Sequence, residues 1–163
     1  MATLKQTAIS PKKKHHWVLP VIALLVIGFP FMSFAFSPLP VMPQDAQIVD
    51  APALSVAGES QPSLTVDSDE LVQILSACPR ARRPEKEKIT DSEQLRLTFR
   101  MADAQGENVQ DCEIRLYAGM MPETLEGFFR YGSFSYPLQD ATSLGKALTD
   151  AAVPLAEIGR AHV

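Results

Sequence analysis

Histidine is nearly missing from this chain of 163 residues. Its three histidines are His15, His16 and His162, so none lies between residues 17 and 161. A Ser-His or Cys-His nucleophile pair and a zinc-protease helix all need histidine, and that stretch cannot supply them. Glycine-rich phosphate loops are absent as well. The sequence therefore predicts no catalytic residue, no cofactor and no metal site within this chain.

Charge is missing from residues 17–36. About twenty residues without charge is the length that a helix needs to cross the hydrocarbon core of a bilayer. Lysines lie at position 5 and at positions 12–14, whereas the next Lys or Arg is Arg80. By the positive-inside rule this asymmetry keeps residues 1–16 in the cytoplasm. We expect a basic tail, a transmembrane signal-anchor at 17–36, and export of the remainder to the periplasm of a bacterial inner membrane.

A cleaved secretory signal peptide is the alternative for the same segment. Ser33 and Ala35 provide small side chains at alternating positions, as a signal peptidase requires near Ala35. The apolar run is longer than an ordinary signal core, and a long tail precedes it, which favours the anchor. Both interpretations export the rest of the chain.

Acidic residues outnumber basic ones in this chain. The chain has 19 Asp and Glu against 15 Lys and Arg, a formal net charge of −4. Since the tail is basic, the exported part is acidic, which argues against nucleic acid as a partner. The tail lysines are expected to fix the topology, with contact to anionic lipid as the alternative.

Only two cysteines are present, Cys78 and Cys112, and both follow the apolar segment. In an oxidising compartment we expect them to form one structural disulfide, worth about 3 kcal/mol. Two buried free thiols are the alternative.

Residues 37–66 contain five prolines and few charges. Proline removes backbone donors and favours extended chain, so this segment is predicted to be a semi-rigid periplasmic linker, or else plainly disordered.

A folded domain is predicted over residues 67–156. Asp67 begins a helix whose apolar face ends at Cys78, and Pro79 stops it. The following loop carries Arg80, Arg82 and Arg83, which are candidates for binding an acidic partner; a solvated loop is the alternative.

The clearest pattern predicts a β-hairpin. Apolar residues alternate with polar ones over 95–101 and again over 112–117, on either side of a turn. The alternation places Cys112 on the apolar face. On the other face it places Arg96 and Arg100 across from Asp111 and Glu113.

Two more helices are predicted, one from Pro122 with Leu125, Phe128 and Phe129 inward, and one from Asp140. Between them, Phe134 and Tyr136 are candidates for an exposed recognition surface, with core covering as the alternative. The predicted fold class is α+β, a hairpin with two to three short helices.

The end of the chain has an unusual pattern. Back-translated as GAG ATC GGA AGA GCA CAC GTC, residues 157–163 resemble a common sequencing adapter read in frame. We therefore expect the natural domain to continue beyond Ala156.

A tail, an anchor, a spacer and a small domain form the layout of many envelope-spanning components. We expect a non-catalytic, single-pass inner-membrane protein whose periplasmic domain binds another protein. The alternative is an exported enzyme or solute-binding protein, released by cleavage, whose site lies in the missing C-terminus.

Overall fold

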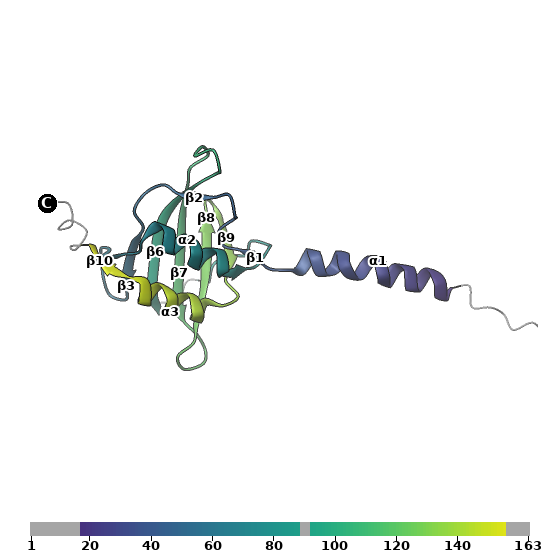
Figure 1. Ribbon diagram of the computed structural model, residues 1–163. Coiled ribbons are helices and arrows are strands. Elements are labelled where there is room, and N and C mark those ends of the chain that lie inside the picture. Colours follow the sequence, from purple (N-terminus) through teal and green to yellow (C-terminus); the bar gives the residue numbers. More distant parts are fainter. Residues whose placement is uncertain (1–16, 89–91, 156–163) are drawn as a thin grey trace, which may run out of the picture. The chain divides into compact units, whose positions relative to one another are not determined.

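The computed structural model describes residues 17–88 and 92–155 (Figure 1). The chain divides into two compact units, residues 1–37 and 38–163. The predicted basic tail at 1–16 and the adapter-like end at 157–163 lie outside the described residues, so both remain predictions.

The described part of the first unit is helix α1, Val18–Phe36, which coincides with the predicted apolar segment. None of its residues is buried, and large side chains such as Leu24, Phe29 and Phe31 are 74% exposed. Its length and composition suffice to cross a membrane, and a signal sequence near the N-terminus has the same properties.

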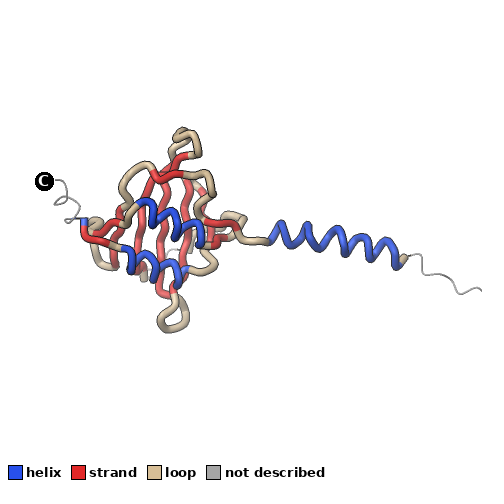
Figure 2. Tube along the Cα trace, viewed as in Figure 1, coloured by secondary structure: helices blue, strands red, loops and turns tan. Residues whose placement is uncertain are grey.

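The second unit is an antiparallel sheet with two helices on one face, as Figure 2 shows. Among the described residues the main sheet has the order β10-β4-β3-β6-β7-β8-β9, with β2 also paired to β6, and β1 pairs separately with β5. The predicted α+β class is therefore confirmed. The strands are β1 Leu39–Pro40, β2 Gln47–Ile48, β3 Ala53–Val56, β4 Leu64–Thr65, β5 Pro79–Arg80, β6 Glu93–Ala102, β7 Gln110–Ala118, β8 Leu125–Tyr131, β9 Phe134–Pro137 and β10 Val153–Pro154; the helices are α2 Ser68–Ala77 and α3 Ala141–Ala151.

The predicted hairpin is the pair β6–β7. Leu97 lies opposite Ile114 and Phe99 opposite Cys112, and all four side chains are buried on the face that the helices cover. Side chains that alternate with these point to the other face of the sheet. The hairpin and its two faces are therefore confirmed.

Helix α2 begins and ends where the sequence predicts. The carboxylate of Asp67 accepts hydrogen bonds from the backbone N–H groups of Asp69 and Glu70, at 3.1 and 3.3 Å, so it caps the helix. Leu71 and Leu75 are fully buried. The predicted helix near Asp140 is α3, capped by a hydrogen bond of 3.3 Å from Ser143 N–H to the Asp140 carboxylate.

The helix predicted from Pro122 is wrong, because this segment is strand β8. Leu125, Phe128 and Phe129 have helical spacing, but Phe129 pairs with Ile114 and faces the core while Phe128 is only half-buried. Gly132, with a φ of +57°, then makes the turn into β9, a backbone conformation that glycine adopts without strain. The segment is a strand because it pairs with β7 on one side and β9 on the other, although the local spacing of its apolar residues suits a helix.

The linker predicted at residues 37–66 is also wrong, because the folded unit begins at Pro38 rather than at Asp67. Strands β1 to β4 lie in this segment, and Val41, Met42 and Leu54 are at most 1% exposed. The backbone N–H of Val41 donates to the carbonyl of Cys78 at 2.9 Å. The prolines separate short pieces of chain that the sheet and α2 hold in place.

The sheet face opposite the helices carries arginines and carboxylates. Arg96 lies across from Arg115 in register, and its Nε is 3.5 Å from Glu113 Oε1. Arg100 lies directly across from Asp111, with 3.5 Å between Nε and Oδ1, as the sequence predicts.

Glu87 comes from the segment after β5, and its side chain is only 8% exposed. It accepts hydrogen bonds from Arg130 at 3.0 Å and from the Tyr117 hydroxyl at 3.1 Å. Glu87 therefore fastens its segment onto the outer face of the sheet.

The inclusion of residues 38–66 in the fold is tested by Leu54→Ala. Because Leu54 is fully buried against β6, its truncation should lower the free energy of unfolding by about 2–5 kcal/mol. The matched control is Val56→Ala on the same strand, where Val56 is 42% exposed and the change should cost well under half as much. Urea unfolding followed by circular dichroism measures both. If both substitutions change the free energy of unfolding by the same small amount, residues 38–66 are a linker rather than part of the fold.

The role of Glu87 is tested by Glu87→Gln. The substitution removes a buried carboxylate from two arginines and a tyrosine, so we expect a loss of about 1–3 kcal/mol in unfolding free energy. Glu85→Gln, at an exposed position two residues away, should change little and serves as the control. If both variants unfold at the same urea concentration as the parent, the outer-face contacts contribute nothing.

Candidate functional site

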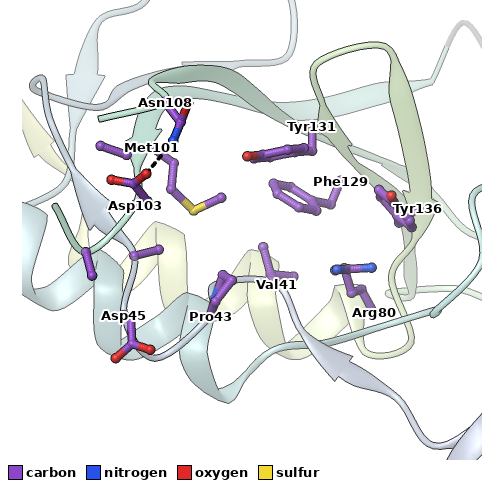
Figure 3. A pocket seen from close by; sticks show the side chains of 13 residues that line it. Val41, Pro43, Asp45, Arg80, Met101, Asp103, Asn108, Phe129, Tyr131 and Tyr136 are labelled. Carbon is purple, nitrogen blue, oxygen red and sulfur yellow. Dashed lines mark hydrogen bonds between the residues drawn. The ribbon is translucent and has the colours of Figure 1, made fainter. Parts of the chain in front are cut away.

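A cavity of about 430 Å³ opens between the sheet and the segment that follows β1 (Figure 3). The end of β6 contributes Met101, strands β8 and β9 contribute aromatic rings, and β5 contributes Arg80. Val41 and Pro43, from the segment predicted to be a linker, form the facing wall. Stretches of chain far apart in sequence therefore build one concave site.

An aromatic wall lines this cavity. The ring of Phe129 has its centroid 6.4 Å from those of both Tyr131 and Tyr136. Residues 129 and 131 alternate on β8, and Tyr136 on β9 pairs with Phe129, so all three side chains lie on the same face of the sheet. Phe129 also stacks on Phe99 of the core at 6.4 Å, which fixes the wall against the interior.

Arg80 is the cationic group of the cavity. Its guanidinium lies 4.2 Å above the ring centroid of Tyr136, a cation–π contact that Figure 3 shows from the side. Nη1 donates a hydrogen bond of 3.1 Å to the carbonyl of Ala81, while Nε is buried and has no acceptor among residues 17–88 and 92–155. Burial lowers the pKa of Arg80 from its ordinary value, and the neighbouring Arg82 adds to this while Tyr136 opposes it.

Asp103 and Asn108 lie on the side of the cavity away from Arg80 and Tyr136 (Figure 3). The Asp103 carboxylate accepts hydrogen bonds from Asn108 Nδ2 at 2.6 Å and from the N–H groups of Glu107 and Gln105 at 2.8 and 3.1 Å. These bonds, that from Asn108 first, lower the pKa of Asp103. Asp103 thus organises the turn between β6 and β7.

The structure brings together two of the five residues singled out from the sequence as an interaction surface. Arg80 and Tyr136 are in contact and line the cavity. Arg82, Arg83 and Phe134 do not line it, and Phe134 is 55% exposed. Sequence reasoning missed Val41, Pro43, Met101, Phe129 and Tyr131 as site residues; the adjacent apolar pair Val41-Met42 between two prolines was the available signal.

We next consider metal binding and catalysis. Within residues 17–88 and 92–155, no group of three or more His, Cys, Asp or Glu side chains is arranged to hold a metal ion. That this chain has no catalytic residue and no cofactor stays a prediction from its sequence.

The two cysteines are not joined in this structure, contrary to the predicted disulfide. Both are buried free thiols, and the Cys78 and Cys112 sulfurs lie 3.9 and 3.7 Å from the carbonyls of Pro79 and Gln110. Both belong to the same buried core, but burial alone does not give two thiols the geometry that a disulfide requires. Burial raises the pKa of Cys78 to about 11 and that of Cys112 to about 12.

Comparisons with protein-family models, with curated proteins and with solved structures find no match for this chain. The fold and the cavity therefore have to be interpreted from their own chemistry.

The state of the cysteines is tested by alkylation of the native chain and of the chain unfolded in urea without reductant. Because the thiolate is the reactive form, both thiols should react slowly when native and fully when unfolded. The raised pKa values favour the folded state below pH 9, the ordinary thiol value, and this stabilisation is lost as the pH rises through about 11 and 12. Mass spectrometry counts the modified residues. An unfolded chain that takes up no reagent until it is reduced would contradict the free thiols.

Proposed function

We propose that this chain is a single-pass protein of a bacterial inner membrane, with its N-terminus in the cytoplasm. Its α+β unit then lies in the periplasm and binds a protein partner as a non-catalytic component of an envelope assembly. The observation that carries the proposal is helix α1: it has no charged residue along its length and buries none of its side chains.

Lipid is the environment that suits such a helix. Its backbone is satisfied internally, and its apolar side chains are exposed. The lysines at positions 12–14, just before it, favour retention of the N-terminus on the cytoplasmic side.

The cavity supports binding as the task of the folded unit. Tyrosine and arginine are enriched where protein partners bind most strongly, and Arg80 and Tyr136 meet at its wall. The apolar side chains around them provide an area that a partner can cover.

A second candidate is an exported solute-binding protein or enzyme that signal peptidase releases near Ala35. The size of the cavity favours it, since about 430 Å³ lies within the range of about 300–1,000 Å³ typical of small-molecule sites. In that case α1 is a signal sequence and is absent from the mature chain.

Fusion of alkaline phosphatase or β-galactosidase to the C-terminus of the full chain tests the topology. Phosphatase is active only outside the cytoplasm and galactosidase only inside it, so we expect active phosphatase, inactive galactosidase and an uncut chain that alkaline carbonate does not extract. Replacing Lys12, Lys13 and Lys14 with Gln should raise the galactosidase signal, because it weakens the charge asymmetry. A shortened, soluble product would support the second candidate, and active galactosidase on the parent chain would refute export.

A further inference from the structure

Arg80 carries a positive charge that the described part of the protein does not neutralise. Within residues 17–88 and 92–155, no carboxylate lies within 4.0 Å of its guanidinium, and its one hydrogen bond runs from Nη1 to Ala81. Nε is buried and has no acceptor. A buried donor without a partner is costly, so such a group requires an explanation.

The contact with Tyr136 does not remove this requirement. A cation–π contact uses the flat face of the guanidinium, whereas its N–H donors point outward from the edge. Protein atoms cover Nε, so a ligand in the cavity meets the Nη end of the guanidinium, where Nη2 makes no hydrogen bond with the described residues while Tyr136 holds the plane in position. Its neighbourhood is apolar, since Val41, Phe129 and Tyr136 line the same cavity.

We propose that the cavity binds a carboxylate attached to an apolar or aromatic group. The carboxylate meets the edge of Arg80, and the attached group packs on the rings of Phe129, Tyr131 and Tyr136. The proposal rests on the function above, in that it assigns a ligand class to the same binding unit.

The chemistry of the cavity favours this class over others. One guanidinium matches one planar carboxylate in a two-point contact, whereas a phosphate ester carries more charge than a single arginine balances. A cationic ligand would need a free acid. Asp103, on the far side, already accepts three hydrogen bonds within its own turn, so these bonds occupy its carboxylate. Asp45 also lines the cavity, but its carboxylate points away from the aromatic rings (Figure 3).

Two sources provide the proposed chemistry. One is the C-terminal carboxylate of a partner protein that ends in an apolar residue, and the other is a free organic acid. Both present a carboxylate next to an apolar body, and the probes below separate them.

The experiment uses the full chain in lipid nanodiscs, with empty nanodiscs as the blank, and measures binding by titration calorimetry. The free-acid probes are 3-phenylpropionate and its uncharged amide. The peptide probes are Gly-Ala-Ala-Phe with a free C-terminus and the same peptide amidated. We expect at least one acid to bind. The matching amide should have an affinity at least about tenfold lower, because it loses the charge-assisted pair. Binding of the peptide acid alone identifies a chain terminus, and binding of 3-phenylpropionate alone identifies a solute.

Variants assign the effect to Arg80. Arg80→Gln should remove the preference for acid over amide, and Arg80→Lys should retain part of it because the charge remains without the planar fork. Arg83→Gln is the matched control: Arg83 is exposed and outside the cavity, so its loss should leave the affinities unchanged. Circular dichroism checks that each variant is folded, and if Arg80→Gln is not, Arg80→Lys and the acid–amide pair on the parent chain decide.

Equal affinity for acid and amide, no binding of either acid, or an undiminished preference in folded Arg80→Gln would overturn the proposal. These outcomes are distinct from a failure of the proposed topology. Binding in nanodiscs does not depend on which side of a cell membrane the unit occupies, and the reporter fusions do not depend on the cavity.

Discussion

The antiparallel pairing of β6 with β7 is the interaction on which the rest of the folded unit depends. These are the two longest strands, and every other strand of the main sheet joins at one side or the other of this pair. Their strict alternation gives the sheet two chemically different faces. Leu97 and Ile114, both fully buried, lie on the face that α2 and α3 cover, while the charged side chains form ion pairs on the other. Because side chains alternate with a period of two, a shift of one residue would exchange the faces, so the hydrophobic pattern also fixes the register.

The elements that could be predicted from the sequence are those with a local cause. The alternation of β6 and β7 extends over enough residues to be unambiguous, and Asp67 and Asp140 cap the helices that follow them through bonds within the first turn. Strand β8 lacked such a signal. Leu125, Phe128 and Phe129 have helical spacing, and only pairing with β7 and β9 makes this segment a strand.

The structure of residues 38–66 also could not be predicted from the sequence. Strands of two residues, such as β1 and β4, are too short to display any period, and the prolines around them resemble those of a spacer. What places Val41 and Leu54 in the core is contact with α2 and β6, more than thirty residues away. The cavity could not be predicted for the same reason, because its walls come from β5, β6, β8, β9 and this segment. Arg80 and Tyr136 could be singled out by residue type, but their meeting depends on the whole sheet.

Arg80 differs from the arginines of the outer face in its lack of a paired carboxylate among the described residues. Each has a carboxylate within 3.0 Å: Glu93 for Arg96, Asp50 for Arg100, Glu113 for Arg115 and Glu87 for Arg130. There the protein supplies a counter-ion even where the pair is well exposed to water and contributes little stability. At Arg80, where burial makes an unbalanced charge more costly, the described residues supply an aromatic ring and a backbone carbonyl instead. A charge kept without its partner in an apolar cavity is a cost to folding, and a carboxylate that enters the cavity removes that cost. Binding of the ligand and stability of the fold are therefore coupled at this one residue.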